Sequence, residues 1–283
     1  MMLATSLRAE CNRLAQNDRD QRIITTTSRV VLTVEYDGTD YCGFQFQVNQ
    51  PTIQDELEKA IYRLTGEKRR VVGASRTDAG VHAMNQVAAF RTGSLLQIKA
   101  FVDGLNYYLP QTIAVKSAFR AGEEFHVQKS AASRQYDYYI LNRAARSPLR
   151  DRFTYLVREP LNIQVMDEAA QVLVGEHDLA SFTSGDLAAV KTTVRRVFQA
   201  CVKRVDDLVV FTIVANSFMP HQIRNTVGTL VLVGLGEMGV AEFNGMMERK
   251  TPGLAGPKAP ASGLHLVQVD YPDPIKEETN EDV

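Results

Sequence analysis

Eleven consecutive residues combine more chemistry than any other stretch of this chain: Gly73-Ala74-Ser75-Arg76-Thr77-Asp78-Ala79-Gly80-Val81-His82-Ala83. The run places a guanidinium, a hydroxyl, a carboxylate and an imidazole beside a flexible Ala-Gly step. A core strand or helix does not concentrate such groups, and glycine next to a carboxylate is typical of a loop that presents functional side chains. The run therefore predicts a functional loop, and the short apolar segments at 71–74 and 87–90 predict strands on either side of it.

Strands and helices are predicted to interleave irregularly around this loop. In residues 30–36 an apolar set (Val30, Leu32, Val34 and Tyr36) alternates with Val31, Thr33 and Glu35, which predicts a half-buried strand. Further strands are predicted at 112–119, 135–141, 193–205, 208–214 and 264–269, and Asp206-Asp207 joins two of them as a hairpin. Helices are predicted from the N-cap Thr52 to Gly66, over 98–108, from 166 to Gly175, and from 223 onward. This mixture favours an α+β fold with largely antiparallel sheet over a doubly wound parallel fold.

The length of 283 residues is enough for two domains, each with its own core. We expect residues 29–122 to form an N-terminal α+β domain that carries the loop. Residues 123–272 are expected to form a C-terminal α+β domain. Residues 1–28 are expected to be a poorly ordered extension, and residues 273–283 an acidic, disordered tail.

Charge is distributed unevenly along the chain, whose formal net charge is −1. The tail carries five acids and one lysine, so the body between the two ends is mildly basic. Any basic surface must come from local clusters, and these occur at 68–70, 143–152 and 195–196. We predict that the first two clusters contact phosphates.

Several classes of protein are disfavoured by the composition. The cysteines, three in number and far apart, suggest neither a disulfide framework nor a metal pair, which fits a reducing cytoplasm. The five histidines lack ligand spacing, so no metal site is expected. The longest apolar run, 227–236, is about half the roughly 20 residues that a membrane span requires, so no membrane association is expected.

Each candidate side chain also has a purely structural interpretation. Asp78 could cap backbone N–H groups in a turn, as aspartate often does. Tyr136 and Tyr138 could be core residues of one strand that hydrogen-bond through their hydroxyls, and for Tyr138 we favour this interpretation. Arg224 lies near the start of a predicted helix, where the helix dipole disfavours a cation, so it either turns toward solvent or pairs with a carboxylate such as Asp78. Leu264 could equally be a core strand residue.

Four stretches, in order, resemble the TruA family of tRNA pseudouridine synthases. They are R-T-D-A-G-V-H at 76–82, R-Q-Y-D-Y at 134–138, F-M-P-H-Q-I-R-N at 218–225 and A-P-A-S-G-L-H-L at 259–266. The opening Y-D-G-T-D-Y at 36–41 and G-E-H-D at 175–178 also resemble family segments. The resemblance covers residues 29–272. Ser75 stands where the family frequently has glycine, which would strain the serine if that position required a positive φ.

This resemblance implies a fold and an activity. The fold is two α+β domains whose mostly antiparallel sheets join across a central basic active-site cleft, and the family works as a homodimer that holds tRNA across both subunits. The activity is isomerisation of uridine to pseudouridine at positions 38, 39 and 40 of the anticodon stem-loop, without metal or cofactor. Asp78 is implied as the catalytic carboxylate and Arg224 as its partner, while Arg76, Tyr136 and Leu264 are implied to contact the substrate, with Tyr136 also a candidate for proton transfer.

Three other functions remain open at this level. A catalytically silent RNA-binding module would bind tRNA without forming product. A hydrolase would use Asp78 to cleave an N-glycosidic bond and would release free uracil. A purely structural protein would leave the 73–83 run without a purpose.

Overall fold

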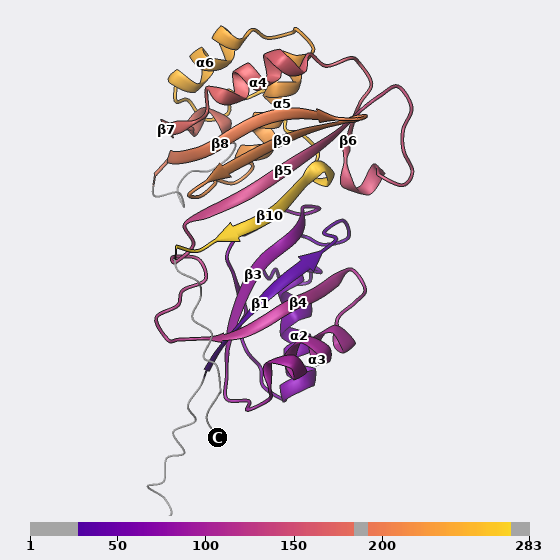
Figure 1. The fold of residues 1–283 in the computed structure, drawn as a ribbon, viewed down its shortest axis with the longest axis vertical. Helices are drawn as coiled ribbons and strands as arrows, with labels where there is room; N and C mark the ends of the chain where they lie inside the picture. The colour runs from indigo at the N-terminus through magenta and orange to yellow at the C-terminus, as the bar shows by residue number, and fades with distance from the viewer. Residues whose placement is uncertain (1–27, 184–191, 273–283) are drawn as a thin grey trace, which may run out of the picture.

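The computed structural model describes residues 28–183 and 192–272, which form one elongated molecule built around a long twisted sheet (Figure 1). The predicted tail and all of the predicted extension except Ser28 lie outside the described residues. The strands are β1 (Ser28–Tyr36), β2 (Val72–Gly73), β3 (His82–Thr92), β4 (Ile113–Ala121), β5 (Ser133–Asn142), β6 (Tyr155–Val157), β7 (Gly175–Asp178), β8 (Val194–Val205), β9 (Leu208–Ala215) and β10 (Leu264–Asp270).

Within the described residues all ten strands belong to one sheet, in the order β4-β1-β3-β10-β5-β9-β8-β7, with β2 paired to β3 and β6 paired to β5. The β10–β3 and β5–β6 pairs are parallel, and the other neighbours run antiparallel. The predicted α+β class with mostly antiparallel sheet is therefore confirmed. Because strands from both halves of the chain share the sheet, the predicted joining of two sheets is confirmed as well.

The helices lie against the two ends of this sheet (Figure 1). They are α2 (Ile53–Thr65), α3 (Ile98–Tyr108), α4 (Ile163–Gln171), α5 (Gln222–Gly234) and α6 (Val240–Glu248). In the N-terminal half α3 packs against β4 and α2, and in the C-terminal half α4 packs against β8, α5 and α6. The buried apolar side chains of strands and helices form one cluster. The domain boundary predicted near residue 122 falls between β4 and β5 and stays a prediction.

Local sequence signals account for the bounds of α2. The Thr52 side chain accepts a hydrogen bond from the Asp55 backbone N–H, and Gly66 ends the helix with a φ of 74°. A hydroxyl N-cap and a left-handed glycine satisfy backbone groups that a helix leaves unpaired at its two ends. Both predicted signals are confirmed.

Other elements differ from the prediction. β6, β7 and α6 were not expected, because β6 is only three residues long, β7 reads Gly-Glu-His-Asp and α6 contains Asn244-Gly245. Gly175 does not end α4, which stops at Gln171, but begins β7 with a φ of 120°. Val31 is fully buried rather than on an exposed face, because both faces of β1 are covered there, as the equally buried Val30 and Leu32 on the opposite face show.

The last described strand, β10, joins the two halves of the sheet. It pairs in parallel with the start of β3 and antiparallel with β5, so Leu266 lies between Ala83 and Tyr136. At the neighbouring register position the His82 and His265 rings stack, with their centroids 4.7 Å apart. His265 Nε2 also lies 3.1 Å from the Phe153 carbonyl oxygen. Two imidazoles are thus buried at the junction between the halves.

We predict that acid weakens this junction through His265. Burial lowers the pKa of His265 to about 4 from 6.5, and the neighbouring His82 acts in the same direction. Because the unfolded chain then binds the proton more readily, the contribution of His265 to stability is complete above about pH 6.5 and is lost as the pH falls toward 4. The free energy of unfolding, measured with urea, should fall by about 2 kcal/mol between pH 7.5 and pH 5 through this group. His265→Phe should lack that part of the pH dependence, and an equal loss in both proteins would contradict the assignment.

Candidate active site

Most of the 73–83 run forms a loop in the structure, as predicted, with its two ends in β2 and β3. Residues 74–81, which we call the signature loop, connect β2 to β3. The fully buried Gln86 of β3 holds the beginning of the loop, because its Oε1 accepts from the Ser75 N–H at 3.2 Å and its Nε2 donates to the Ser75 carbonyl at 2.8 Å. A buried amide that satisfies both backbone groups of one residue fixes the path of the loop.

A second segment packs directly against the backbone of the signature loop. The Phe44 N–H donates to the Thr77 carbonyl at 3.1 Å. Gly43 has a φ of 93°, and a Cβ there would lie 2.6 Å from the Thr77 carbonyl oxygen. A Cβ at Gly38 would lie 2.0 Å from the Val81 carbonyl oxygen. The glycines of the 36–43 segment therefore permit an approach that no side chain would allow.

Two tyrosine hydroxyls hold hydroxyl side chains of the signature loop. Tyr36 Oη lies 2.8 Å from Thr77 Oγ1, and Tyr136 Oη lies 2.7 Å from Ser75 Oγ. Ser75 is not among the non-glycine residues with positive φ in the described chain, so the serine found in place of glycine is not strained. Its hydroxyl instead connects the loop to β5.

The structure brings Arg224 and Asp78 together. Arg224 Nη1 lies 3.4 Å from Asp78 Oδ2. The same guanidinium donates from Nε to the Ala259 carbonyl at 2.8 Å, and the Ala259 N–H donates to the Arg224 carbonyl at 3.1 Å. Arg224 is thus aimed by the segment that leads into β10. Of the two interpretations of Arg224, pairing with a carboxylate is confirmed.

The start of α5 supplies further positive potential to Asp78. Arg224 lies in the first turn of this helix, where the dipole favours an anion. His221, at the N-cap position, has a φ of 61° and places Nε2 3.8 Å from Asp78 Oδ2. No role was expected of His221 from the sequence, yet its side chain faces the same carboxylate, and 28% of the Asp78 side chain is exposed.

Tyr136 is buried beside this carboxylate. Its side chain is only 5% exposed, and its ring meets Phe218 edge to face at 5.3 Å between centroids. Burial raises the pKa of Tyr136 to about 12, with the charge of Asp78 acting in the same direction and the hydrogen bond to Ser75 opposing it. The phenol is therefore protonated at neutral pH.

The other tyrosine of this strand has a structural role. Tyr138 is fully buried and donates its hydroxyl to the Pro260 carbonyl at 2.7 Å, which confirms the core interpretation. Leu264 begins β10 in register with Tyr138 and is 5% exposed. It lies on the strand next to Tyr136, and its role against a substrate base stays a prediction.

Arg76 remains open to solvent. It makes no ion pair within the described residues and lines a hollow of about 110 Å³ together with Arg70 and Gln128. An exposed guanidinium two residues before Asp78 is placed where a phosphate or a base could meet it.

Two structural findings bear on other kinds of site. Among residues 28–183 and 192–272, no group of three or more His, Cys, Asp or Glu side chains is arranged to hold a metal ion. No helix of that part of the chain is both long and apolar enough to cross a membrane.

Known proteins resemble this chain over most of its length. A family model described as tRNA pseudouridine synthase matches residues 32–128 and 169–272. A protein from Pelobacter propionicus named tRNA pseudouridine synthase A is 42% identical over 242 residues, covering 86% of this chain and 99% of the relative. Its counterpart in Rhodospirillum rubrum is 44% identical over 245 residues, covering 86% and 88%. The counterpart in a Thermoanaerobacter species is 38% identical and covers 86% and 99%.

This chain belongs to the tRNA pseudouridine synthase family. The resemblance to TruA stated from the sequence is therefore confirmed, and so is the enzyme class, an isomerase that forms pseudouridine in tRNA. The two matched segments include Asp78 and Arg76 on one side and Arg224 and Leu264 on the other. Tyr136 lies outside the two matched segments. It belongs to β5, which pairs with β10 of the second segment.

Several residues that shape this pseudouridine synthase site were missed in the sequence. Gln86 lies directly before the predicted strand 87–90. The signal available in the sequence was a polar side chain at a position where the strand is buried. The actual strand begins at His82, so Gln86 lies within it and faces the signature loop. The hydroxyl contacts of Ser75 and Tyr36 were not predicted, because a hydroxyl pair between distant segments has no pattern in the sequence.

Gly43→Ala should disturb the signature loop of this synthase more than it disturbs the fold. Its Cβ would displace the Thr77 carbonyl, 2.6 Å away, and with it the adjoining Asp78. Displacements of about 1 Å at a catalytic group cost about a hundredfold in rate, so we expect that loss in pseudouridine formation. Gly66→Ala is the matched control, because its φ of 74° carries a similar backbone cost of about 1 kcal/mol but its Cβ would meet no atom within 4 Å. Equal activity of the two variants, at comparable stability in urea, would contradict the prediction.

Proposed function

We propose that this tRNA pseudouridine synthase isomerises uridines at positions 38, 39 and 40 of the anticodon stem-loop, with Asp78 as the carboxylate that engages the ribose. The arrangement that supports it is the pair of Asp78 and Arg224, held 3.4 Å apart. The carboxylate is partly exposed, on a loop fixed by Gln86, and faces the start of α5. The choice of positions rests on the resemblance of the four motifs to TruA.

The proposed reaction breaks one bond to C1′ and forms another. The Asp78 carboxylate either attacks C1′ as N1 of uracil leaves with the bonding electrons, or removes the C2′ proton so that uracil leaves by elimination. The freed uracil then turns, and its C5 bonds to C1′. In the first route Asp78 leaves C1′ as this bond forms, and in the second the C2′ proton returns to carbon. Loss of the C5 proton, together with protonation of N1, completes the isomerisation with no change in overall composition.

Tyr136 is proposed to take part in the last proton transfer. Since its pKa is raised to about 12, the phenol is protonated at neutral pH and its oxygen is a weak base. It can accept the C5 proton only while handing its own proton to Ser75 Oγ, 2.7 Å away, as the Ser75 hydroxyl releases its own proton to solvent. The hydroxyl pair thereby supplies a relay between the base and the signature loop.

Access to the ribose requires the target uridine to leave its stack. Extruding a nucleotide from a stem costs a few kcal/mol, and contacts that hold the RNA elsewhere must offset this cost. We propose that the exposed Arg76 contacts the displaced nucleotide or its phosphate, and that Leu264 packs against the base. A homodimer holding tRNA across both subunits and a cytoplasmic location stay predictions drawn from the family resemblance and the composition.

The first experiment is tritium release from tRNA labelled at uracil C5, with Asp78→Asn beside the unaltered enzyme. Because the new C–C bond must expel this tritium, we expect release by the wild type and at least about a thousandfold less by the variant. The matched control is Asp103→Asn, which removes an exposed carboxylate paired with Lys99 on α3 and should leave the rate unchanged. Full activity of Asp78→Asn would contradict the proposal.

The same assay separates the remaining alternatives and tests the positions. Free uracil in place of pseudouridine would indicate a hydrolase, and binding without either product would indicate a silent RNA-binding module. Transcripts in which uridine 38, 39 or 40 is changed singly to cytidine should each lose modification at that position alone. Modification confined to uridines outside the anticodon stem-loop would overturn the assignment of positions.

Tyr136→Phe should slow the chemical step while leaving RNA binding nearly intact. General acid–base groups contribute about a hundredfold or more, so a loss of about this size is expected in single-turnover tritium release. Tyr138→Phe is the control on the same face of β5. It removes the hydrogen bond to the Pro260 carbonyl, costs about 1 kcal/mol of stability and should change the rate by less than about threefold. A rate loss of the same size in both variants would show that the Tyr136 hydroxyl has no special part.

A further inference from the structure

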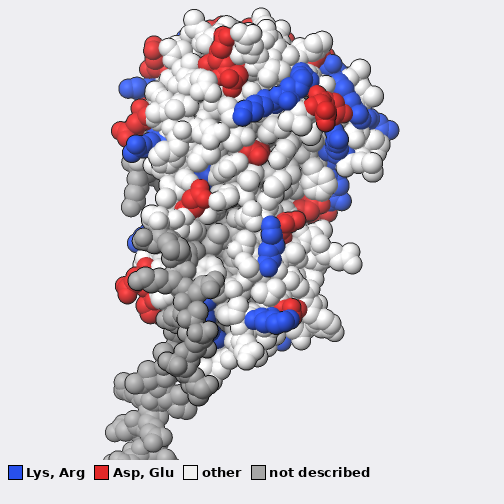
Figure 2. Space-filling view, in the orientation of Figure 1, with Lys and Arg blue, Asp and Glu red and all other residues white. Residues whose placement is uncertain are grey.

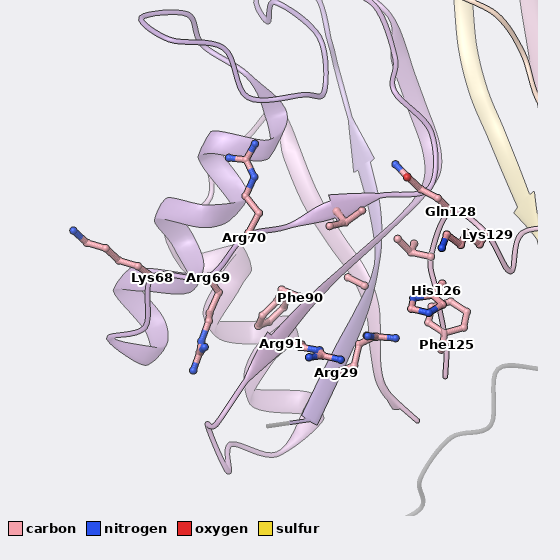
Figure 3. A pocket seen from close by; sticks show the side chains of 13 residues that line it. Arg29, Lys68, Arg69, Arg70, Phe90, Arg91, Phe125, His126, Gln128 and Lys129 are labelled. Carbon is pink, nitrogen blue, oxygen red and sulfur yellow. The ribbon is translucent and has the colours of Figure 1, made fainter. Parts of the chain in front are cut away.

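A second hollow, much larger than the one beside Arg76, lies along the edge of the N-terminal half (Figure 3). It has a volume of about 440 Å³, and we call it the basic groove. Its walls come from the segment that connects α2 to β2, from β1 and β3, and from the segment between β4 and β5. Six cationic side chains line it: Arg29, Lys68, Arg69, Arg70, Arg91 and Lys129.

Half of these cations lack a carboxylate partner within the described residues. Arg69, Arg70 and Arg91 each have one, at 3.0, 3.6 and 2.6 Å. In contrast, no ion pair with a described acid involves Lys68, Lys129 or Arg29. The groove therefore has a surplus of positive charge.

Of the three, Arg29 gives the clearest evidence of uncompensated positive charge. It is 9% exposed, and its Nη1 donates to the Glu123 backbone carbonyl at 3.0 Å. A carbonyl satisfies a donor but does not neutralise the guanidinium, and burying an uncompensated cation is unfavourable. An anionic ligand in the groove would supply the missing charge.

The basic groove continues toward Asp78. Arg70, Val72 and Gln128 line both the groove and the smaller hollow that Arg76 lines. Gln128 also donates from Nε2 to the Gly73 carbonyl at 2.9 Å, which attaches one wall of the groove to the beginning of the signature loop. The hollows thus form one path from the groove to the residue two positions before Asp78.

The other cluster expected to contact phosphates is different in the structure. Arg143 and Arg150 both donate to the Asp207 carboxylate, at 3.0 and 2.5 Å. Arg152 donates to Asp40 at 2.6 Å. On the face in Figure 2, Lys and Arg side chains gather at the upper right, around the loop before β6, and acidic side chains lie among them. These arginines are already compensated, so they offer less to a phosphate than the basic groove does.

We propose that the basic groove holds the sugar–phosphate backbone of the RNA strand that carries the target uridine, on one side of that nucleotide. The cations neutralise successive phosphates, and the apolar wall of Val72, Phe125 and Val127 faces the sugars. This assignment rests on the proposed function for the identity of the RNA. The groove then fixes the position of the strand while Arg76 and Asp78 act on the extruded nucleotide.

The test measures how the affinity for tRNA depends on salt. Lys68→Gln/Lys129→Gln removes two exposed cations without breaking an ion pair of the described chain. The matched control, Arg143→Gln/Arg150→Gln, also removes two charges, both paired with Asp207. Binding is measured in the Asp78→Asn background, so that the RNA is not altered during the titration.

Each lost phosphate contact should lower the slope of log K against log salt by about 0.7–0.9. The groove variant should therefore have a slope smaller by about 1.5 and bind about 10- to 40-fold more weakly at 0.1 M salt. The control variant should change the slope by less than half as much. Equal changes in the two variants, or an unchanged slope in the groove variant, would overturn the proposal.

A short anticodon stem-loop RNA tests which part of the substrate lies in the groove. Since the groove is continuous with the Arg76 hollow, the groove variant should lose as much affinity for the stem-loop as for whole tRNA. A loss confined to whole tRNA would overturn the assignment to the target strand. Binding does not depend on product, so a groove effect together with absent pseudouridine formation by the wild type would contradict the proposed function while still showing that the groove binds RNA phosphates.

Discussion

The site depends on the pairing of β10 with two strands from opposite halves of the chain. Its hydrogen bonds to β3 and β5 place the signature loop, which precedes β3, next to Tyr136 of β5. The segment before β10 also receives the side chain of Arg224, through the carbonyl of Ala259. Without this strand the two halves would share no sheet, and Asp78, Arg224 and Tyr136 would belong to separate surfaces. The buried histidine stack and the Tyr138 hydrogen bond both stabilise this junction.

The charge arrangement around Asp78 follows from where these elements end. A carboxylate in a partly exposed loop faces the beginning of α5, an arginine of its first turn and the imidazole of His221. The first turn of α5 and the Arg224 guanidinium therefore surround this carboxylate with positive potential. Tyr136 has the opposite character, because burial and the nearby anion keep its phenol protonated. The two oxygen acids therefore lie in different surroundings, with Asp78 partly exposed among cationic groups and Tyr136 buried.

The sequence predicted those parts whose signals are local or carried by motifs. Alternation predicted β1 and β5, capping residues predicted α2, and the motif order indicated that Asp78 and Arg224 meet. Alternation failed for Val31, because burial on both faces of an interior strand depends on its neighbours in the sheet. The contacts of Gln86 and of the Ser75 hydroxyl were not predicted, because their partners are backbone and hydroxyl groups that only the fold brings near. Whether the cations of a basic cluster have carboxylate partners likewise depends on acids far away in the sequence, such as Asp207.

The parallel pairing of β3 and β10 has a consequence during synthesis of the chain. β3 ends at Thr92 and β10 begins at Leu264, so about 170 residues are made between them. At about 5–20 residues per second, β3 waits roughly 10 to 30 seconds for this neighbour. During that time the edge beside His82 and Ala83 has unpaired backbone groups, the kind of edge that recruits strands from other chains. The nascent N-terminal half is therefore the form of this protein with the greatest need of a chaperone, and the active site is the last part of the molecule to be completed.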